Sequence, residues 1–161
     1  RYLRRPRNPR RRRRLPPQNL HIVIGDTLVS HNTSRMVQQV SELKDKHPEI
    51  VNPLLDAIEG VSLNAIHYFN NPKELGWYMD MNHALLDALG VGHPALSRLV
   101  LAARSAGAFG AKLTGAGGGG CMVALSPKGV KHRVAKAIES CNARAIVTGI
   151  DIEGARRENH V

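Results

Sequence analysis

Hydrophobic residues recur along the chain with two different spacings. Four short and mostly apolar runs predict β-strands, at residues 21–24, 111–114, 121–125 and 145–150. Two longer segments between the first two runs repeat apolar residues every three or four positions, which predicts amphipathic helices. Their apolar faces comprise Met36, Val37, Val40 and Leu43 in one segment, and Leu54, Leu55, Ile58, Val61 and Ala65 in the other. The chain therefore combines short strands with longer helices.

Proline and glycine mark the expected ends of the helices. A proline in the first turn of a helix loses no hydrogen bond, because the N–H groups there have no partner within the helix. Such positions are found at Asn52-Pro53, Asn71-Pro72, His93-Pro94 and Ser126-Pro127, and Gly90 and Gly107 are suited to end helices. The predicted order is strand, four helices, strand, glycine-rich loop, strand, helix, strand. This order indicates an α+β fold, with a small antiparallel sheet packed with helices on one side.

The loop between the second and third predicted strands is the most unusual segment of the chain. Residues 112–121 read Lys-Leu-Thr-Gly-Ala-Gly-Gly-Gly-Gly-Cys, so half of them are glycine. Glycine costs backbone entropy on folding, and such a loop indicates that main-chain N–H groups approach something bulky and negative, such as a phosphate. The alternative is a flexible turn, although linker glycines usually alternate with serine or charged residues.

Two common nucleotide-binding motifs fit this loop poorly. Gly115, Gly117 and Gly120 match the spacing G-x-G-x-x-G, but that motif opens a helix, whereas an apolar run typical of a strand follows here. A Walker-type loop carries Lys and then Ser or Thr after its last glycine, whereas Lys112 precedes the first glycine. Both motifs are therefore disfavoured.

The glycine loop resembles the third motif of the kinases that phosphorylate galactose, homoserine, mevalonate and phosphomevalonate. Within that superfamily the chain is most similar to mevalonate kinases of archaeal type, in order and spacing from about residue 20 to about residue 151. The matching segments are Ile24-Gly25-Asp26-Thr27, Asn32-Thr33, 48–55, Met81-Asn82-His83, 86–93 and 102–111. The chain departs from the family pattern at Leu28, where glycine is expected, and at Ser30-His31, where a basic residue is common.

The resemblance implies that residues 20–161 form the ferredoxin-like C-terminal domain of such a kinase. It implies phosphorylation of mevalonate to 5-phosphomevalonate by ATP, a step of isoprenoid biosynthesis, with Mg²⁺ neutralising charge. The family's second, glycine- and serine-rich motif, its catalytic Asp and Lys and its magnesium ligands belong to the N-terminal half. Neither that motif nor the opening Pro-Gly-Lys segment occurs in this chain. We therefore expect no catalytic residue and no metal ligand here, no activity from this chain alone, and ATP and Mg²⁺ held mainly by the missing half.

The same resemblance gives this half a supporting role beside phosphate and substrate. Backbone N–H groups would brace the phosphate-binding motif from the glycine loop, which comprises Gly115, Ala116, Gly117, Gly118, Gly119 and Gly120. Thr33 matches a threonine that faces the active site, and it equally fits a helix cap. Lys112 is either a phosphate contact or a solvated lysine at the end of a strand, and Thr114 is a further candidate contact to substrate. Asp26 is expected in a turn rather than as a catalytic base.

Positive charge is concentrated at the N-terminus. The 161 residues carry 23 Lys and Arg against 13 Asp and Glu, yet nine arginines lie within residues 1–14, which contain no acid. Without those nine, 14 basic and 13 acidic residues leave a net charge of +1. Residues 1–19 are expected to be a disordered Arg- and Pro-rich tail. Either this tail is non-native coding, or it binds phosphate charge, as an anionic-lipid contact or as the nucleic-acid-binding arm of a non-catalytic kinase-like module.

Several other classes of protein and site have no support in the sequence. Cys121 and Cys141 form no C-x-x-C and have no histidine pair nearby, so we expect buried thiols rather than a metal site or a disulfide framework. The sequence has no signal-peptide core and no apolar span of about 18 residues, so we expect a cytoplasmic protein without membrane contact. A homodimer is compatible with the resemblance. The resemblance is also compatible with a phosphomevalonate kinase or a homoserine kinase, because much of the pocket that would distinguish these substrates is missing.

Overall fold

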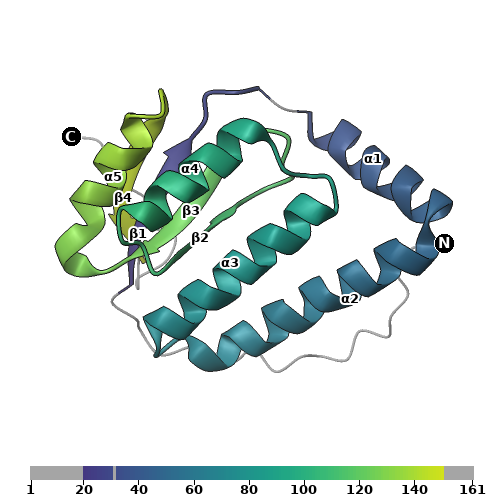
Figure 1. Cartoon of the computed structure of the whole chain (residues 1–161), viewed down its shortest axis with the longest axis horizontal. Coiled ribbons are helices and arrows are strands. Elements are labelled where there is room, and N and C mark those ends of the chain that lie inside the picture. The colour runs from purple at the N-terminus through teal and green to yellow at the C-terminus, as the bar shows by residue number, and fades with distance from the viewer. Residues whose placement is uncertain (1–19, 31, 151–161) are drawn as a thin grey trace, which may run out of the picture.

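The computed structural model describes residues 20–30 and 32–150, and its elements follow the predicted order (Figure 1). The strands are β1 (His21–Asp26), β2 (Gly110–Leu113), β3 (Cys121–Ser126) and β4 (Arg144–Gly149). The helices are α1 (Thr33–Lys46), α2 (Pro48–Ala65), α3 (Pro72–Ala88), α4 (Pro94–Ser105) and α5 (Lys131–Glu139), with short 3-10 turns η1 (Ile66–Tyr68) and η2 (Lys128–Val130). The tail predicted for residues 1–19 lies outside the described residues.

The four strands form one antiparallel sheet with the order β2-β3-β1-β4. Val23 at the centre of β1 lies opposite Ala124 of β3 on one side and Val147 of β4 on the other. Strands β1 and β2 are separated in the sheet by β3, and β3 and β4 are separated by β1, as in the split βαβ units of ferredoxin-like folds, whereas β2 and β3 pair directly as a hairpin. The predicted α+β fold with a small antiparallel sheet is thereby confirmed.

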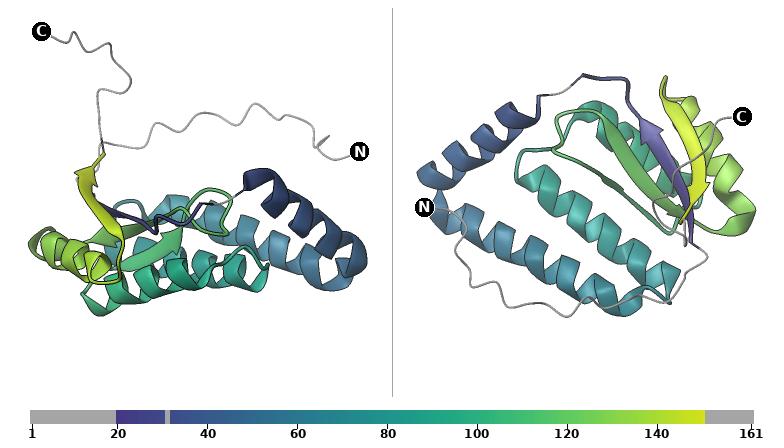
Figure 2. Two further views of the ribbon diagram at one scale, coloured as in Figure 1. Left: turned by 90° about the horizontal axis from the view of Figure 1, so that it is seen from above. Right: turned by 180° about the vertical axis from the view of Figure 1, so that it is seen from behind.

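The helices lie against one face and one edge of this sheet. Helix α4 packs on β2 and β3, and α5 packs on β1 and β4, so these two helices cover the same face (Figure 2). Helix α3 runs along β2, α2 packs on the outer side of α3, and α1 crosses the end of α2 (Figure 1). The opposite face of the sheet is not covered by any helix of the described residues.

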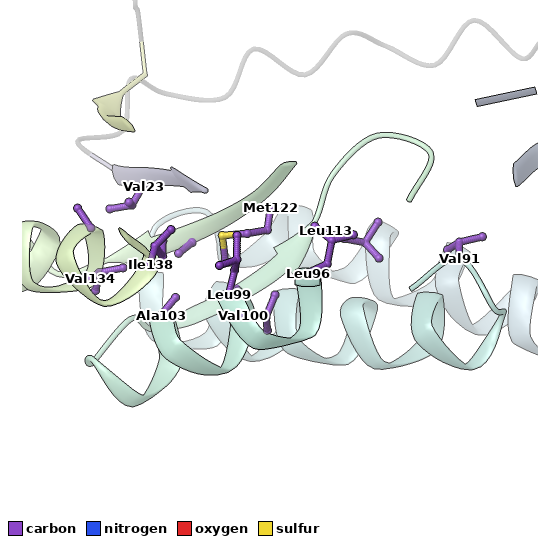
Figure 3. Close-up of a cluster of buried hydrophobic side chains, with 13 residues drawn as sticks. Val23, Val91, Leu96, Leu99, Val100, Ala103, Leu113, Met122, Val134 and Ile138 are labelled. Carbon is purple, nitrogen blue, oxygen red and sulfur yellow. The ribbon is translucent and has the colours of Figure 1, made fainter. Parts of the chain in front are cut away.

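The main hydrophobic core lies between the sheet and the helices α4 and α5 (Figure 3). Inward positions alternate along the strands, so that Val23 and Met122 are fully buried while Ile24 stays partly exposed. Leu96 and Leu99 of α4 and Ile138 of α5 fill the space opposite them, each at most 2% exposed. Burial of large aliphatic side chains of this kind is the main source of stability in a domain of this size.

Two helices differ from the sequence prediction. Helix α2 begins at Pro48, so Pro53 lies inside the helix rather than in its first turn, where it removes one backbone donor. Helix α1 contains no buried residue, and Val37 on its predicted apolar face is 62% exposed. Its periodicity correctly predicts a helix, whereas burial of each side chain depends on what lies opposite it: Met36, Val40 and Leu43 are half-buried and Val37 is exposed.

Candidate functional site

The glycine loop between β2 and β3 has a backbone conformation that favours glycine. Its five glycines all have positive φ angles, from 72° at Gly120 to 137° at Gly119. Residues with a Cβ rarely adopt this left-handed region, because the Cβ approaches the following carbonyl oxygen. Backbone conformation therefore favours glycine at all five positions.

Backbone hydrogen bonds fix the loop to two neighbouring segments. The N–H of Gly118 donates to the carbonyl of Val91, in the turn after α3, at 2.9 Å. The N–H of Gly120 donates to the carbonyl of Val29, beyond β1, at 3.1 Å. The carbonyl of Gly120 in turn accepts from the backbone N–H of Thr27 at 2.9 Å and from its buried hydroxyl at 2.8 Å. The loop is thus anchored at its centre and at its C-terminal end.

Other N–H groups of the loop make no hydrogen bond to any described residue. They are those of Gly115, Ala116, Gly117 and Gly119. Successive backbone donors in left-handed and turn conformations form concave sites that bind anions. Gly115 is exposed and Ala116 is half-buried, so their main-chain donors suit a phosphate or a loop that carries one, whereas Gly117 and Gly119 are buried.

A hollow of about 640 Å³ lies where the N-terminal part of α1 faces this loop. It is lined by Ser30, Asn32, Thr33, Arg35, Met36, Gln39 and Gly118. Met36 packs closely on the loop, since a Cβ added to Gly118 would lie 2.6 Å from its sulfur atom. The segment around Thr33 therefore lies beside the glycine loop. The sequence predicts both as parts of one site, although they are far apart in the chain.

Asn32, not Thr33, caps helix α1. The Oδ1 atom of Asn32 accepts the backbone N–H of Arg35 at 3.1 Å, which is the usual N-cap hydrogen bond. Thr33 is the first residue of the helix, and its exposed hydroxyl makes no hydrogen bond to a described residue. The cap alternative for Thr33 is therefore wrong, and its hydroxyl is available to a ligand in the hollow.

Two polar side chains of the hollow, those of Arg35 and Gln39, are not predicted from the sequence. Arg35 is the only charged residue among the described residues that line it, so this described lining is positive. The Nε2 atom of Gln39 donates to the carbonyl of Gly90 at 3.3 Å and ties α1 to the turn that also holds Gly118. Both follow Asn32 at helical spacing, which places them on the face of α1 that carries Thr33 and Met36.

Other candidate residues lie outside the hollow. Lys112 is half-buried and its Nζ donates to the carbonyl of Leu113 at 2.8 Å, and burial lowers the pKa of Lys112 below its ordinary value. Lys112 is therefore partly withdrawn from water at the end of β2. Thr114 is exposed and closes the loop through its N–H, which donates to the carbonyl of Cys121 at 3.0 Å. Gly115 and Ala116 lie on the loop beyond the residues that form the hollow.

The turn after β1 explains one departure from the family pattern. Asp26 is the last residue of β1, and its Oδ1 accepts the backbone N–H of Leu28 at 2.9 Å, so Asp26 starts a turn as predicted. Leu28 has a φ of 59° and is 68% exposed. A left-handed conformation is the reason that glycine suits this position, and Leu28 occupies it at a cost of about 1–2 kcal/mol.

Within residues 20–30 and 32–150, no three His, Cys, Asp or Glu side chains gather closely enough to hold a metal ion. Cys121 and Cys141 are free thiols and half-buried, and burial, together with the charge of Asp26, raises the pKa of Cys121. In the same ranges, no helix combines the length and apolar character needed to span a bilayer.

The fold, the anchored glycine loop and the hollow beside it define a kinase domain of known type. The family model described as GHMP kinases C terminal matches residues 62–144, more than half of the chain, and the chain belongs to this family. Mevalonate kinase of Pyrococcus abyssi is 43% identical over 151 residues, which cover 89% of this chain and 45% of that protein. The resemblance stated from the sequence is therefore confirmed.

Solved structures agree with this placement. Mevalonate kinase of L. major, in complex with R-mevalonate, superposes with a TM-score of 0.74 and 28% identity over 76% of this chain and 39% of that chain. Phosphomevalonate kinase of Streptococcus pneumoniae has a TM-score of 0.70 and 20% identity over 83% of this chain and 41% of that chain, a likeness that shows the fold alone. The chain thus spans about half the length of the proteins it matches.

Proposed function

We propose that this chain is the C-terminal domain of a mevalonate kinase, which transfers the γ-phosphoryl group of ATP to mevalonate. The observation that carries the proposal is the 43% identity to the Pyrococcus abyssi enzyme across 89% of the chain. The glycine loop lies within residues 62–144, which the family model matches, and α1 places the positive hollow beside it. The domain therefore supplies one side of a phosphate site that is completed by an N-terminal half.

Phosphoryl transfer depends mainly on positioning and on stabilisation of negative charge, so a domain without a catalytic base still contributes to it. The N–H groups of Gly115 and Ala116, which make no hydrogen bond to a described residue, are fixed dipoles next to the anchored Gly118 and Gly120. Fixed donors cost no reorganisation when charge develops on the transferred group. These groups would brace the phosphates and the motif that holds them.

The residues present fit the phosphates of ATP but not a magnesium ion. Magnesium prefers carboxylate and water oxygens, and the described lining of the hollow contains no carboxylate. Magnesium would supply charge neutralisation when bound, and its ligands belong to the N-terminal half. This domain would contribute the guanidinium of Arg35 and the hydroxyl of Thr33 instead. A cation at this place favours an acceptor that carries a carboxylate, as mevalonate does, over a neutral sugar.

The acceptor is tested by joining residues 20–161 to two different N-terminal halves, that of Pyrococcus abyssi mevalonate kinase and that of Streptococcus pneumoniae phosphomevalonate kinase. ADP release is then measured with each half and its own acceptor. We expect kcat/KM to be at least about 100-fold higher with the mevalonate kinase half, because the two faces of that pocket are matched. Intact Pyrococcus abyssi enzyme is the positive control. Higher activity with the phosphomevalonate kinase half would contradict the proposal and favour phosphomevalonate as acceptor.

A further inference from the structure

The outer edge of β2 is hydrogen-bonded by side chains rather than by another strand. Strand β2 lies at one end of the sheet, so N–H groups on its outer side have no partner strand. The N–H of Ala111 donates to Oδ1 of Asp80 at 2.9 Å, and the N–H of Leu113 donates to Nδ1 of His83 at 3.3 Å. Both acceptors belong to α3, three residues apart on the helix face that runs along β2. Side chains of a helix thus complete a sheet edge that would otherwise be open to pairing.

The two acceptors are held differently. Asp80 is fixed a second time, because its Oδ2 pairs with Nε of Arg104 on α4 at 3.1 Å. His83 is only 9% exposed, and its partner Leu113 is the last residue of β2, two residues before the first glycine of the loop. Loss of the His83 hydrogen bond would therefore change the position of Leu113, which fixes where the glycine loop starts.

We infer that His83 is a positioning residue of the glycine loop: its neutral imidazole holds Leu113 against α3, and protonation of that imidazole releases the N-terminal end of the loop. The hydrogen bond has a required protonation state. Nδ1 accepts the N–H of Leu113 only when it carries no proton, and the imidazolium would place one donor against another. A change in pH thus changes a bond at the start of the loop.

The groups around His83 come from three elements. Asp80 and Asp87 lie on its own helix, Lys112 is on β2 and Arg104 is on α4. Burial lowers the pKa of His83 from its ordinary value of 6.5, and Lys112 and Arg104 act in the same direction, while Asp87 and Asp80 oppose it. The neutral form is therefore favoured in the folded chain. Its contribution to stability is complete above pH 6.5 and is lost as pH falls through the lowered pKa.

The positioning of the loop is independent of what the loop binds, whereas any effect on phosphoryl transfer rests on the proposed function. Two variants separate the parts of the inference. His83→Asn keeps an acceptor, Oδ1, close to the place of Nδ1 but cannot be protonated in this range. His83→Leu removes the acceptor and leaves the N–H of Leu113 without a partner.

Amide exchange in the full chain, followed by NMR at about pH 7.5 and about pH 5, tests the positioning. The protection factor of the Leu113 amide is expressed relative to that of Val23 in the central strand. This ratio cancels the pH dependence of the intrinsic exchange rate and of global unfolding. In the parent chain we expect it to fall at least about tenfold at the lower pH. In His83→Asn the relative protection of Leu113 should be equal at the two pH values. In His83→Leu it should be low at both pH values. Parallel losses in the parent and in His83→Asn would overturn the inference, and these two decide it if His83→Leu does not fold.

The enzymatic consequence is measured in the fusion with the Pyrococcus abyssi N-terminal half. The acid side of the kcat/KM profile should move to lower pH in His83→Asn, while the alkaline side should stay unchanged. Unchanged acid sides in parent and variant would show that the loop position does not limit catalysis. Exchange results as expected together with an inactive fusion would count against the proposed function and leave the positioning role intact.

Discussion

Gly117→Ala is expected to lower the free energy of unfolding by about 3 kcal/mol or more. Gly117 has a φ of 81°, and a Cβ there would lie 2.0 Å from the carbonyl oxygen of Val91. That carbonyl is held by the N–H of Gly118, so it cannot move aside without breaking the bond that anchors the centre of the loop. The loss is measured by urea unfolding of the full chain.

Gly115→Ala provides a matched control for this change. Gly115 has the same φ of 81°, but a Cβ there would meet no atom within 4 Å. Only conformational strain applies, and the expected loss is about 1–2 kcal/mol. The difference between the two variants therefore measures the crowding against Val91. Equal losses would show that the loop is not packed against the turn after α3 in the way described.

Gly76→Ala is expected to cost about 3–5 kcal/mol, because it separates α3 from β2. A Cβ on Gly76 would lie 2.3 Å from the carbonyl oxygen of Phe109 and 2.8 Å from the backbone nitrogen of Gly110. The crowding atoms are backbone on both sides, so relief requires the helix to move outward. That movement would also lengthen the hydrogen bonds of Asp80 and His83 to β2.

Gly60→Ala gives the opposite result on a neighbouring helix. Gly60 lies inside α2, and a Cβ there would contact nothing within 4 Å. Alanine has the higher helix propensity, so this variant should gain about 0.5–1 kcal/mol. Urea unfolding of the two variants side by side checks the sign as well as the size. A similar effect of both substitutions would contradict the close approach of α3 to β2.

The order of helices and strands could be predicted because its signals are local. Residue periodicity identified the elements, and glycines such as Gly90 and Gly107, both with positive φ, marked where helices end. The start of α2 was placed too late, because Pro48 and Pro53 both satisfy the rule for a first turn. The exposure of Val37 could not be read from periodicity, since burial depends on what lies opposite a helix face.

The site was predictable only in the parts that a motif carries. The glycine loop is visible from composition alone, and Thr33 was found through the family resemblance. Arg35 gave no signal, because 83 residues separate it from Gly118, its neighbour across the hollow. The role of His83 required knowledge of which strand lies at the edge of the sheet, and strand order is a property of the folded chain.

The central claim is that this chain is one half of a mevalonate kinase whose activity requires the other half. It is tested most directly by measuring ATP- and mevalonate-dependent ADP release from three samples. These are this chain alone, the Pyrococcus abyssi N-terminal half alone, and the two joined in one polypeptide. We expect background rates from each part alone and a rate of about 1–100 per second, typical of kinases, from the joined protein. Kinase-rate ADP release from this chain alone, or a folded fusion without activity, would contradict the claim.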